Sequence, residues 1–555
     1  MRRLVVWLIA SKYGMDPSQT FPRPVLLAGS PVTAGTLSRL AVYIVLCAFA
    51  LSPLLWVRVP PLADYPNHLA RMWILVHGLE IPDLLANYQI HWRVLPDLAM
   101  DLVVSMLSPV LSVEDAGRAF VALTMALLVA GTAALHRVLH GRVGLWPLAS
   151  LLFLYNASLF WGFLNSLFAT AVYLFAFAGW IVTRNARPGP RILAFSAVAT
   201  TLFSLHLFGF GLYGLSVVSY EVGIRLEGRR LRLRSLRPLL AISLQFVPAV
   251  VLWHVSRQHA GSTLIDYGAL SYKLYALVAP VTFHARCFPL DAALWLIIVL
   301  FVIYAGRRGM LRVAPEMRIP LSAMAVAAIA MPHVVSGSWL ADIRLPVALP
   351  FVALAATRLD LPPRRAFAVA LAGFAMLAVR VWVVSQSWAD YNRWFGEFRT
   401  AAAAIAPGAR LAVVAEPIPP ERQTLRGLPA VMGTAEDAVF QHLPLLAVID
   451  RAVFLPYIFT GWTTVDVAPR NAAISQPAGG PMTPAELVKT ADPETANSLV
   501  AVPNMLGQLP YWRNWTQTFD YLLWMDFGGA PHPRPDRLQL VVSGSFFEIY
   551  KITRP

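Results

Sequence analysis

Eleven apolar stretches recur along the 555 residues, and most are about as long as the hydrocarbon core of a bilayer requires of a helix. They cover roughly 38–57, 117–135, 146–162, 166–183, 192–208, 209–224, 238–255, 290–306, 318–333, 344–358 and 365–385. Only 14% of the residues are charged, whereas a soluble domain carries about a quarter. The sequence therefore predicts an α-helical polytopic membrane protein, and it excludes a soluble enzyme, a disordered chain and a coiled coil.

A further segment, residues 97–112, is apolar but does not fit a membrane crossing. It is short, begins at Pro96-Asp97 and carries Asp101. A carboxylate is costly inside the hydrocarbon core. We therefore expect a helix that lies along the membrane surface.

Arginine-rich loops indicate the topology. The clusters fall at 137–142, 184–191, 225–237, 307–318 and 358–365. Positive residues favour the cytoplasmic side, and eleven crossings place every cluster there, with the N-terminus inside and the C-terminus outside. The net charge of +15 thus reflects topology and contact with membrane lipids, not nucleic acid. The two cysteines match no metal-binding spacing.

This topology divides the chain into two parts. Residues 1–385 form the transmembrane domain, with a large first outer loop at 58–116 and a second at 256–289. Residues 386–555 form an extracytoplasmic α/β domain, because no further spanning run follows. We expect strands at Leu411–Ala415, Val453–Phe459, Tyr521–Phe527 and Leu538–Val542, and helices at Trp388–Ala406 and Ala435–Ile449.

The first outer loop holds polar groups suited to chemistry at the membrane surface. Asp64 follows the first apolar stretch by seven residues, and Pro66 limits the freedom of the backbone beside it. His68 and Arg71 come four and seven residues later, on one face of any helix that begins near Pro66. An acid, an imidazole and a guanidinium would suit a reaction between a membrane-bound phosphate and an outside acceptor. The alternative is that Asp64 caps that helix.

The overall plan resembles that of the GT-C glycosyltransferases, which use polyprenyl-phosphate-linked sugars and include protein O-mannosyltransferases and aminoarabinose transferases. The resemblance covers the whole chain: a long first outer loop with an acidic residue, many spans and an outer C-terminal domain. Asp64 aligns with the family's catalytic acidic position. The stretch Asp342-Ile343-Arg344-Leu345-Pro346 is similar to the family's acidic-Arg entry to a late helix, where the Arg is expected near the donor's phosphate.

The resemblance implies an inverting glycosyltransferase on the outer face of a bacterial inner membrane, with a periplasmic C-terminal domain. It implies a polyprenyl-phosphate sugar as donor and a glycan, lipid or protein as acceptor. Asp64 would be the base that takes the acceptor's proton. Arg344 would hold the leaving phosphate, with Arg286 and Lys273 as second choices. Asp342 either orients Arg344 or forms an ordinary ion pair in the loop.

Two departures from the family bear on metal binding. The turn from Asn156 to Asn165 offers amides where several relatives carry a second carboxylate, and Asp64 stands alone where some relatives have an Asp-Glu pair in the first loop. No metal is therefore assigned, and a divalent cation is left as an open alternative. Histidines gather at the outer ends of the predicted helices, where they either line a polar cavity or are separate interfacial residues: His68, His91, His206, His254, His284 and His333.

Two other functions stay open. A transporter or flippase of lipid-linked glycans would place charged residues and broken helices near the mid-plane of the membrane, and few are found there. A non-catalytic assembly subunit would use the outer α/β domain to bind a partner.

Overall fold

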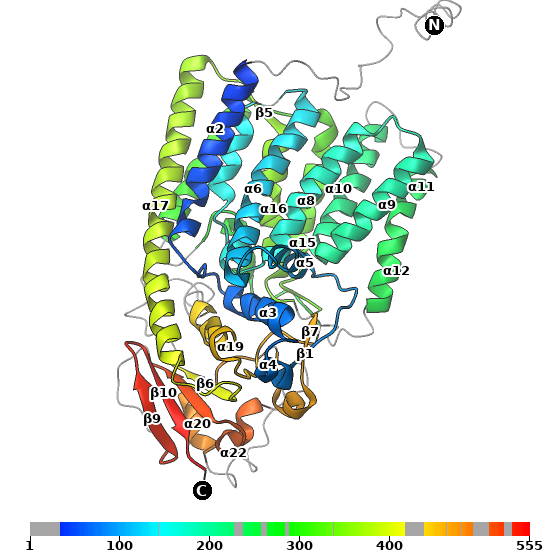
Figure 1. The fold of residues 1–555 in the computed structure, drawn as a ribbon. Helices are drawn as coiled ribbons and strands as arrows, with labels where there is room; N and C mark the ends of the chain where they lie inside the picture. Colours follow the sequence, from blue (N-terminus) through cyan, green and yellow to red (C-terminus); the bar gives the residue numbers. More distant parts are fainter. Residues whose placement is uncertain are drawn as a thin grey trace, which may run out of the picture.

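The computed structural model describes residues 34–142, 144–226, 237–256, 264–283, 288–336, 338–416, 438–461, 463–477, 479–491, 510–526 and 535–554. Helices dominate, and they form a bundle above a smaller part that contains most of the strands (Figure 1). All eleven apolar ranges contain helical residues.

The bundle is built from helices that run alternately up and down, because short turns join most neighbours (Figure 1). Its helices are α2 (Ala34–Leu51), η1 (Ser52–Leu55), α6 (Val113–His140), η2 (Trp146–Phe153), α7 (Ala157–Phe160), α8 (Leu164–Val182), α9 (Pro188–Leu205), α10 (Leu207–Leu226), α11 (Arg237–Ser243), η4 (Leu244–Phe246), α12 (Val247–Ser256), α13 (Leu270–Val278), α14 (Phe288–Arg307), η7 (Pro315–Met317), α15 (Arg318–Ala330), α16 (Ala341–Ala356) and α17 (Pro363–Ala402). Two short pairings close turns of the bundle: β2 (Ile265–Asp266) with β4 (Val334–Val335), and β3 (Leu311–Val313) with β5 (Thr357–Leu359).

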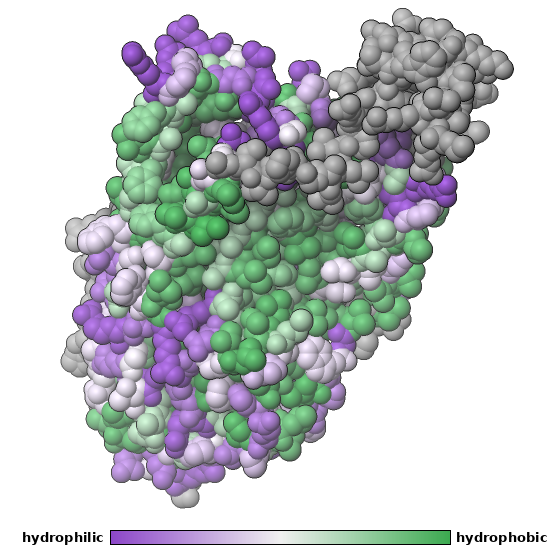
Figure 2. Space-filling view, turned by 45° about the horizontal axis from the view of Figure 1, so that its top comes forward, coloured by the Kyte–Doolittle hydropathy of each residue, from purple (hydrophilic) through white to green (hydrophobic). Residues whose placement is uncertain are grey.

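The surface of the bundle is apolar. Figure 2 shows a hydrophobic band over the helices, with hydrophilic residues gathered on either side of it. Large side chains such as Leu300 on α14 and Phe367 on α17 are exposed there, which fits contact with lipid. Among the described residues, six helices are long and apolar enough to cross a membrane: Gly35–Leu55, Val113–His140, Leu164–Val182, Leu207–Arg225, Phe288–Arg307 and Pro363–Ala402. The chain is therefore a multi-pass membrane protein, and the number of crossings, eleven, stays a prediction.

The first outer loop folds beneath the bundle, where α3 (Tyr65–His77) lies across the helix ends (Figure 1). It is followed by α4 (Pro82–Asn87), β1 (Tyr88–Ile90) and α5 (Ala99–Leu107). With 9 residues, α5 is about 14 Å long at 1.5 Å per residue. That is too short to cross the hydrocarbon core. This length agrees with the expectation that residues 97–112 do not cross the membrane.

The C-terminal part contains a four-stranded sheet in the order β6-β8-β10-β9. The strands β6 (Leu411–Ala415) and β8 (Tyr521–Met525) are parallel, whereas β10 (Phe547–Ile552) is antiparallel to both β8 and β9 (Leu538–Ser543). The remaining elements are η8 (Leu443–Leu445), α19 (Leu446–Arg451), β7 (Val465–Val467), η9 (Pro469–Ile474), α20 (Pro484–Lys489), η10 (Tyr511–Asn514) and α22 (Trp515–Thr518).

Three of the four predicted strands are confirmed as β6, β8 and β9, but the strand predicted at Val453–Phe459 is wrong. That segment makes only one bridge, between Phe454 and Arg410. It is apolar because it is buried against the first outer loop, where the Val453 carbonyl accepts a hydrogen bond from the Tyr88 hydroxyl (3.0 Å).

The first outer loop and the C-terminal part are joined closely. Strand β1 pairs with β7 in antiparallel register, Tyr88 opposite Val467. The buried Asn87 amide donates to the carbonyls of Gly408 (3.3 Å) and Ala452 (3.0 Å). The expected division at residue 385 falls inside α17, which continues from the bundle to Ala402. Residues far apart in the sequence can therefore meet under the bundle.

Candidate active site

Asp64 sits where the first outer loop passes under the helices, just before α3. Its backbone N–H donates to the Trp161 carbonyl (3.2 Å), and the N–H of Ala63 donates to Phe160 (2.8 Å). The Asp64 side chain makes no capping hydrogen bond to α3. The capping alternative thus does not describe this carboxylate, which is 21% exposed.

Arg344 lies in the first turn of α16 and is partly buried. One of its terminal nitrogens donates to the Ser338 hydroxyl (2.8 Å), and its Cζ lies 4.7 Å from the centre of the Phe163 ring. Its Nε is buried without a hydrogen-bond partner among the described residues. A guanidinium with unused donors is what an incoming phosphate requires.

Residues 161–163, between α7 and α8, bring Asp64 and Arg344 to one place. Gly162 has φ +83°, and a Cβ there would lie 3.0 Å from both N and Cβ of Asp64. The next residue, Phe163, carries the Arg344 guanidinium on its ring. Arg344 is near enough to Asp64 for its charge to lower the pKa of that carboxyl. The acid and the guanidinium, 280 positions apart in sequence, thus share one site.

Burial sets the protonation of Asp64. It raises the pKa of this carboxyl from 3.8 to about 7, and the charge of Arg344 offsets part of the rise. A carboxyl with a pKa near neutrality can both accept and release a proton. This is the property required of a general base.

A second carboxylate, Asp97, faces the same guanidinium, and no local pattern in the sequence marks it as a site residue. The Asn165 amide donates to the Asp97 carboxylate (2.9 Å) and carbonyl (3.0 Å), and it accepts from the backbone N–H of Met100 (2.8 Å). Burial raises the pKa of Asp97 to about 6, while the charges of Arg71 and Arg344 lower it. The amide-rich turn therefore holds a carboxylate instead of supplying one.

His68 and Arg71 do lie on one face of α3, but Arg71 is already paired. Its guanidinium contacts both oxygens of the buried Asp101 carboxylate, at 2.7 and 2.9 Å. Its other terminal nitrogen is 3.3 Å from Nδ1 of His68. Burial and the charge of Arg71 lower the pKa of His68 well below its usual range. His68 is thus neutral beside Asp64, and Arg71 links α3 to α5.

Lys273 and Asp342 form a separate cluster. The Lys273 ammonium lies 3.2 Å from one Asp342 oxygen and donates to the Met331 carbonyl. The other Asp342 oxygen is 3.1 Å from Nδ1 of His333. The fully buried Asp342 thus forms an ion pair with Lys273, and no hydrogen bond to Arg344 is found among the described residues.

Of the remaining predicted site residues, only His254 is among the described residues, and no contact between it and Asp64 is found there. His254 is exposed near the end of α12, at the edge of the bundle (Figure 1). Arg286 and His284 lie outside the described residues.

His442, from the C-terminal part, also reaches the site. Its Nε2 lies 3.4 Å from an Asp64 oxygen, and its Nδ1 lies 3.1 Å from the Asn67 amide nitrogen. Burial lowers the pKa of His442 to about 4, so it is neutral. No local pattern in the sequence marks this histidine, because its role depends on the packing of α3 against η8 and α19.

The structure does not test the open alternative of a divalent cation. Within the described ranges, no three side chains among His, Cys, Asp and Glu gather as a metal ion would require. Asp64 and Asp97 instead share the charge of Arg344.

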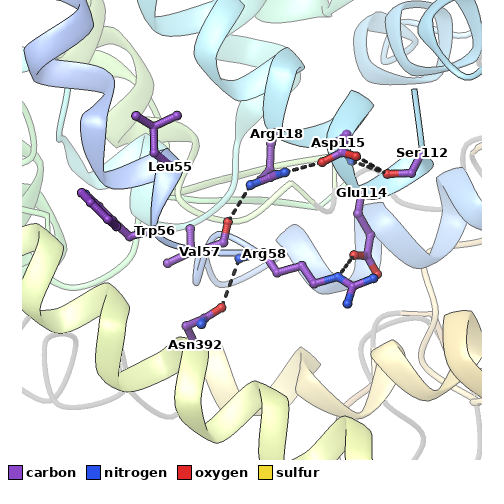
Figure 3. Close-up of a pocket in the computed structure, with 9 residues that line it drawn as sticks. All are labelled: Leu55, Trp56, Val57, Arg58, Ser112, Glu114, Asp115, Arg118 and Asn392. Atoms are coloured by element: carbon purple, nitrogen blue, oxygen red, sulfur yellow. Dashed lines mark hydrogen bonds and ion pairs between the residues drawn. The ribbon is translucent and has the colours of Figure 1, made fainter. Parts of the chain in front are cut away.

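An open pocket of about 430 Å³ lies where the segment after α2 passes the start of α6 (Figure 3). Arg118 bridges Asp115 and the Val57 carbonyl, and Arg58 contacts Glu114 at 2.5 Å. The residues that line this pocket include Trp56, which is 68% exposed. Neither Asp64 nor Arg344 lines this pocket, so it is distinct from the site described above.

No protein-family model matches the chain, and no curated protein matches it. Two solved structures are similar over 93% of its length. One is ArnT from Cupriavidus metallidurans in the apo state, at 14% identity and a TM-score of 0.44, with 98% of that chain covered. The other is the arabinofuranosyltransferase AftD from Mycobacteria, at 15% identity and a TM-score of 0.41, with 40% of that chain covered.

Proposed function

We propose that the chain is a membrane glycosyltransferase that moves a sugar from a polyprenyl phosphate to an acceptor hydroxyl. The reaction takes place at the outer face of the bacterial inner membrane. The observation that carries this proposal is the meeting of Asp64, with a pKa near 7, and Arg344, with an unpartnered Nε.

In the proposed reaction, the Asp64 carboxylate takes the proton of the acceptor hydroxyl. The acceptor oxygen then forms a bond to the anomeric carbon, and the bond from that carbon to the phosphate oxygen breaks. The polyprenyl phosphate leaves with the electron pair, and Arg344 stabilises its negative charge. Attack opposite the leaving phosphate inverts the anomeric centre. Asp97 keeps Arg344 in place by its charge.

The distribution of charge favours this function over transport. Asp291, which pairs with Arg380 of α17, lies in the first turn of α14. Glu221 and its partner Arg225 lie in the last turns of α10. A transporter is expected to keep such groups near the mid-plane of the membrane. The donor, the acceptor and the inner-membrane location remain part of the proposal.

Two variants test the two roles separately. Purified protein in nanodiscs is incubated with a panel of undecaprenyl-phosphate sugars and envelope extract, and release of undecaprenyl phosphate is followed by mass spectrometry. Asp64→Asn should lower transfer at least about a hundredfold and leave the binding of undecaprenyl phosphate unchanged. Arg344→Ala should weaken that binding at least about tenfold.

Arg118→Ala is the matched control, because it removes an arginine from the neighbouring pocket in Figure 3. It should change neither quantity. Undiminished transfer by Asp64→Asn would reject the base, and unchanged affinity in Arg344→Ala would reject the phosphate contact.

A further inference from the structure

The Asn67 side chain, three residues after Asp64, has a fixed orientation. Its Oδ1 accepts from the backbone N–H of Phe459 (2.8 Å), and its Nδ2 donates to the carbonyl of Tyr457 (3.1 Å). Reversing the amide would place two acceptors together at Tyr457 and two donors together at Phe459. Asn67 is also fully buried, so no solvent could satisfy the reversed arrangement.

This orientation decides which nitrogen of His442 carries the proton. The second hydrogen of the Asn67 Nδ2 points at Nδ1 of His442, 3.1 Å away. Nδ1 must therefore accept, and a neutral ring with an accepting Nδ1 carries its proton on Nε2. That Nε2 is the nitrogen that lies 3.4 Å from Asp64. A donor thus lies near the proposed base.

We propose that His442 is a positioning residue whose Nε2–H donates to Asp64 when this carboxylate is ionised, and that Asn67 fixes the tautomer that makes this possible. The proposal rests on the proposed role of Asp64 as base. The present separation of 3.4 Å exceeds the usual range for an N–H···O bond, and we expect it to shorten on ionisation, because charge-assisted hydrogen bonds are shorter.

The other charged and titratable groups around this pair come from two elements, α3 and α16. Arg344 on α16 faces Asp64, His68 on α3 faces His442, and Arg71 on α3 faces His68. His68 is held neutral by burial, and Arg71 is neutralised by its pair with Asp101. Besides Arg344, His442 is therefore the described side chain placed to stabilise the ionised Asp64.

The arrangement would make the site depend on the C-terminal part. His442 follows Asn67 by 375 positions, and it precedes η8, which packs against α3. Displacement of this part from α3 would withdraw the Nε2–H from Asp64.

The test measures the ionisation of Asp64 directly, without transfer. Full-length protein in nanodiscs is treated with a hydrophobic carbodiimide, which labels protonated carboxyls, and labelling of Asp64 is quantified by peptide mass spectrometry from pH 5 to 10. In the wild type, labelling should fall through a midpoint near pH 7, the pKa to which burial raises Asp64. His442→Phe keeps the ring volume and removes the donor, so the midpoint should rise by about one unit.

His442→Gln places an amide nitrogen where Nε2 lies and should bring the midpoint back toward the wild type. His77→Phe, at the other end of α3, is the control and should leave it unchanged. Transfer needs the ionised carboxylate, so it is full above the pKa and falls as pH drops through it. The falling limb of transfer should therefore move to higher pH in His442→Phe.

An unchanged midpoint in His442→Phe overturns the inference, and so does an equal rise in His442→Gln, because volume and not the donor would then be responsible. If the midpoint rises in His442→Phe alone but the wild type transfers no sugar, the Asp64–His442 interaction stands and the proposed function fails.

Discussion

Gly162 and Asp64 touch through their backbones, and this contact places the carboxylate. Gly162 has φ +83°, which L side chains rarely adopt, and an added Cβ would fall 3.0 Å from Asp64. Glycine satisfies both demands at once. The position of the proposed base thus depends on a residue that has no side chain.

Gly162→Ala should lower transfer more than it lowers stability. The backbone strain alone costs about 1–2 kcal/mol, but the added methyl group must also push Asp64 out of place, and a small misplacement at a reacting group can cost a hundredfold in rate. Gly461→Ala is the control, because Gly461 has nearly the same φ, +86°, with nothing described within 4 Å. Thermal unfolding and transfer are measured for both variants. Equal losses of transfer would show that the contact with Asp64 has no effect.

Single residues could be predicted only where the sequence marks them locally. Asp64 follows an apolar stretch and a pair of prolines, and Arg344 stands two positions after an acid at a helix entry. Asp97 and His442 have no such mark. Asp97 reaches the site because Asn165 holds it, and His442 because Asn67 does. Such contacts join distant parts of the chain and appear only once it is folded.

Among the elements, α3 and α5 are joined by a buried ion pair. Both Arg71 and Asp101 are almost inaccessible, with side chains 2% and 1% exposed. The pair Arg118–Asp115 on α6 has the same chemistry, but its side chains are 31% and 45% exposed. Water and salt screen the second pair and not the first.

Arg71→Met should therefore destabilise the protein by about 3–5 kcal/mol, because it leaves the Asp101 charge buried without a partner. Arg118→Met should cost only about 0.2–1 kcal/mol. The double variant Arg71→Met/Asp101→Leu should recover most of the loss, since it removes both charges. Thermal unfolding in detergent compares the three. A double variant as unstable as Arg71→Met would contradict this account.

Helices and strands could be predicted where the apolar pattern of their own residues indicates the element. The apolar ranges became helices because a helix satisfies its backbone within itself. Strands β6 and β8 follow from short apolar runs. The segment Val453–Phe459 is equally apolar, but it packs against the first outer loop instead of joining the sheet. The pairing of β1 with β7 could not be predicted, because three-residue strands carry almost no pattern.

At the scale of the whole molecule, the arginine-rich turns that follow α6 and α8 lie at the opposite end of the bundle from α3, which Asp64 precedes (Figure 1). The helix α6 runs from Val113, near α3, to His140 at the far end. The pairing of β3 with β5 closes the same far end. The positive-inside rule places that end in the cytoplasm.

Cysteine labelling checks this orientation. With Cys47 and Cys287 replaced by Ser, His140→Cys should react with an impermeant maleimide only after the membrane is opened. Leu79→Cys, just after α3 and 76% exposed, should react in intact cells. The reverse pattern would place Asp64 in the cytoplasm and contradict transfer at the outer surface.

The helix α17 has 40 residues and measures about 60 Å at 1.5 Å per residue, twice the thickness of the hydrocarbon core. The second half of α17 consequently extends beyond the hydrocarbon core as a continuous helix, and it holds the C-terminal sheet at a fixed distance and orientation. One residue inserted in that half would rotate the C-terminal sheet about the helix axis by about 100°. The number of residues in α17 therefore sets both the distance and the orientation of the C-terminal sheet relative to the bundle.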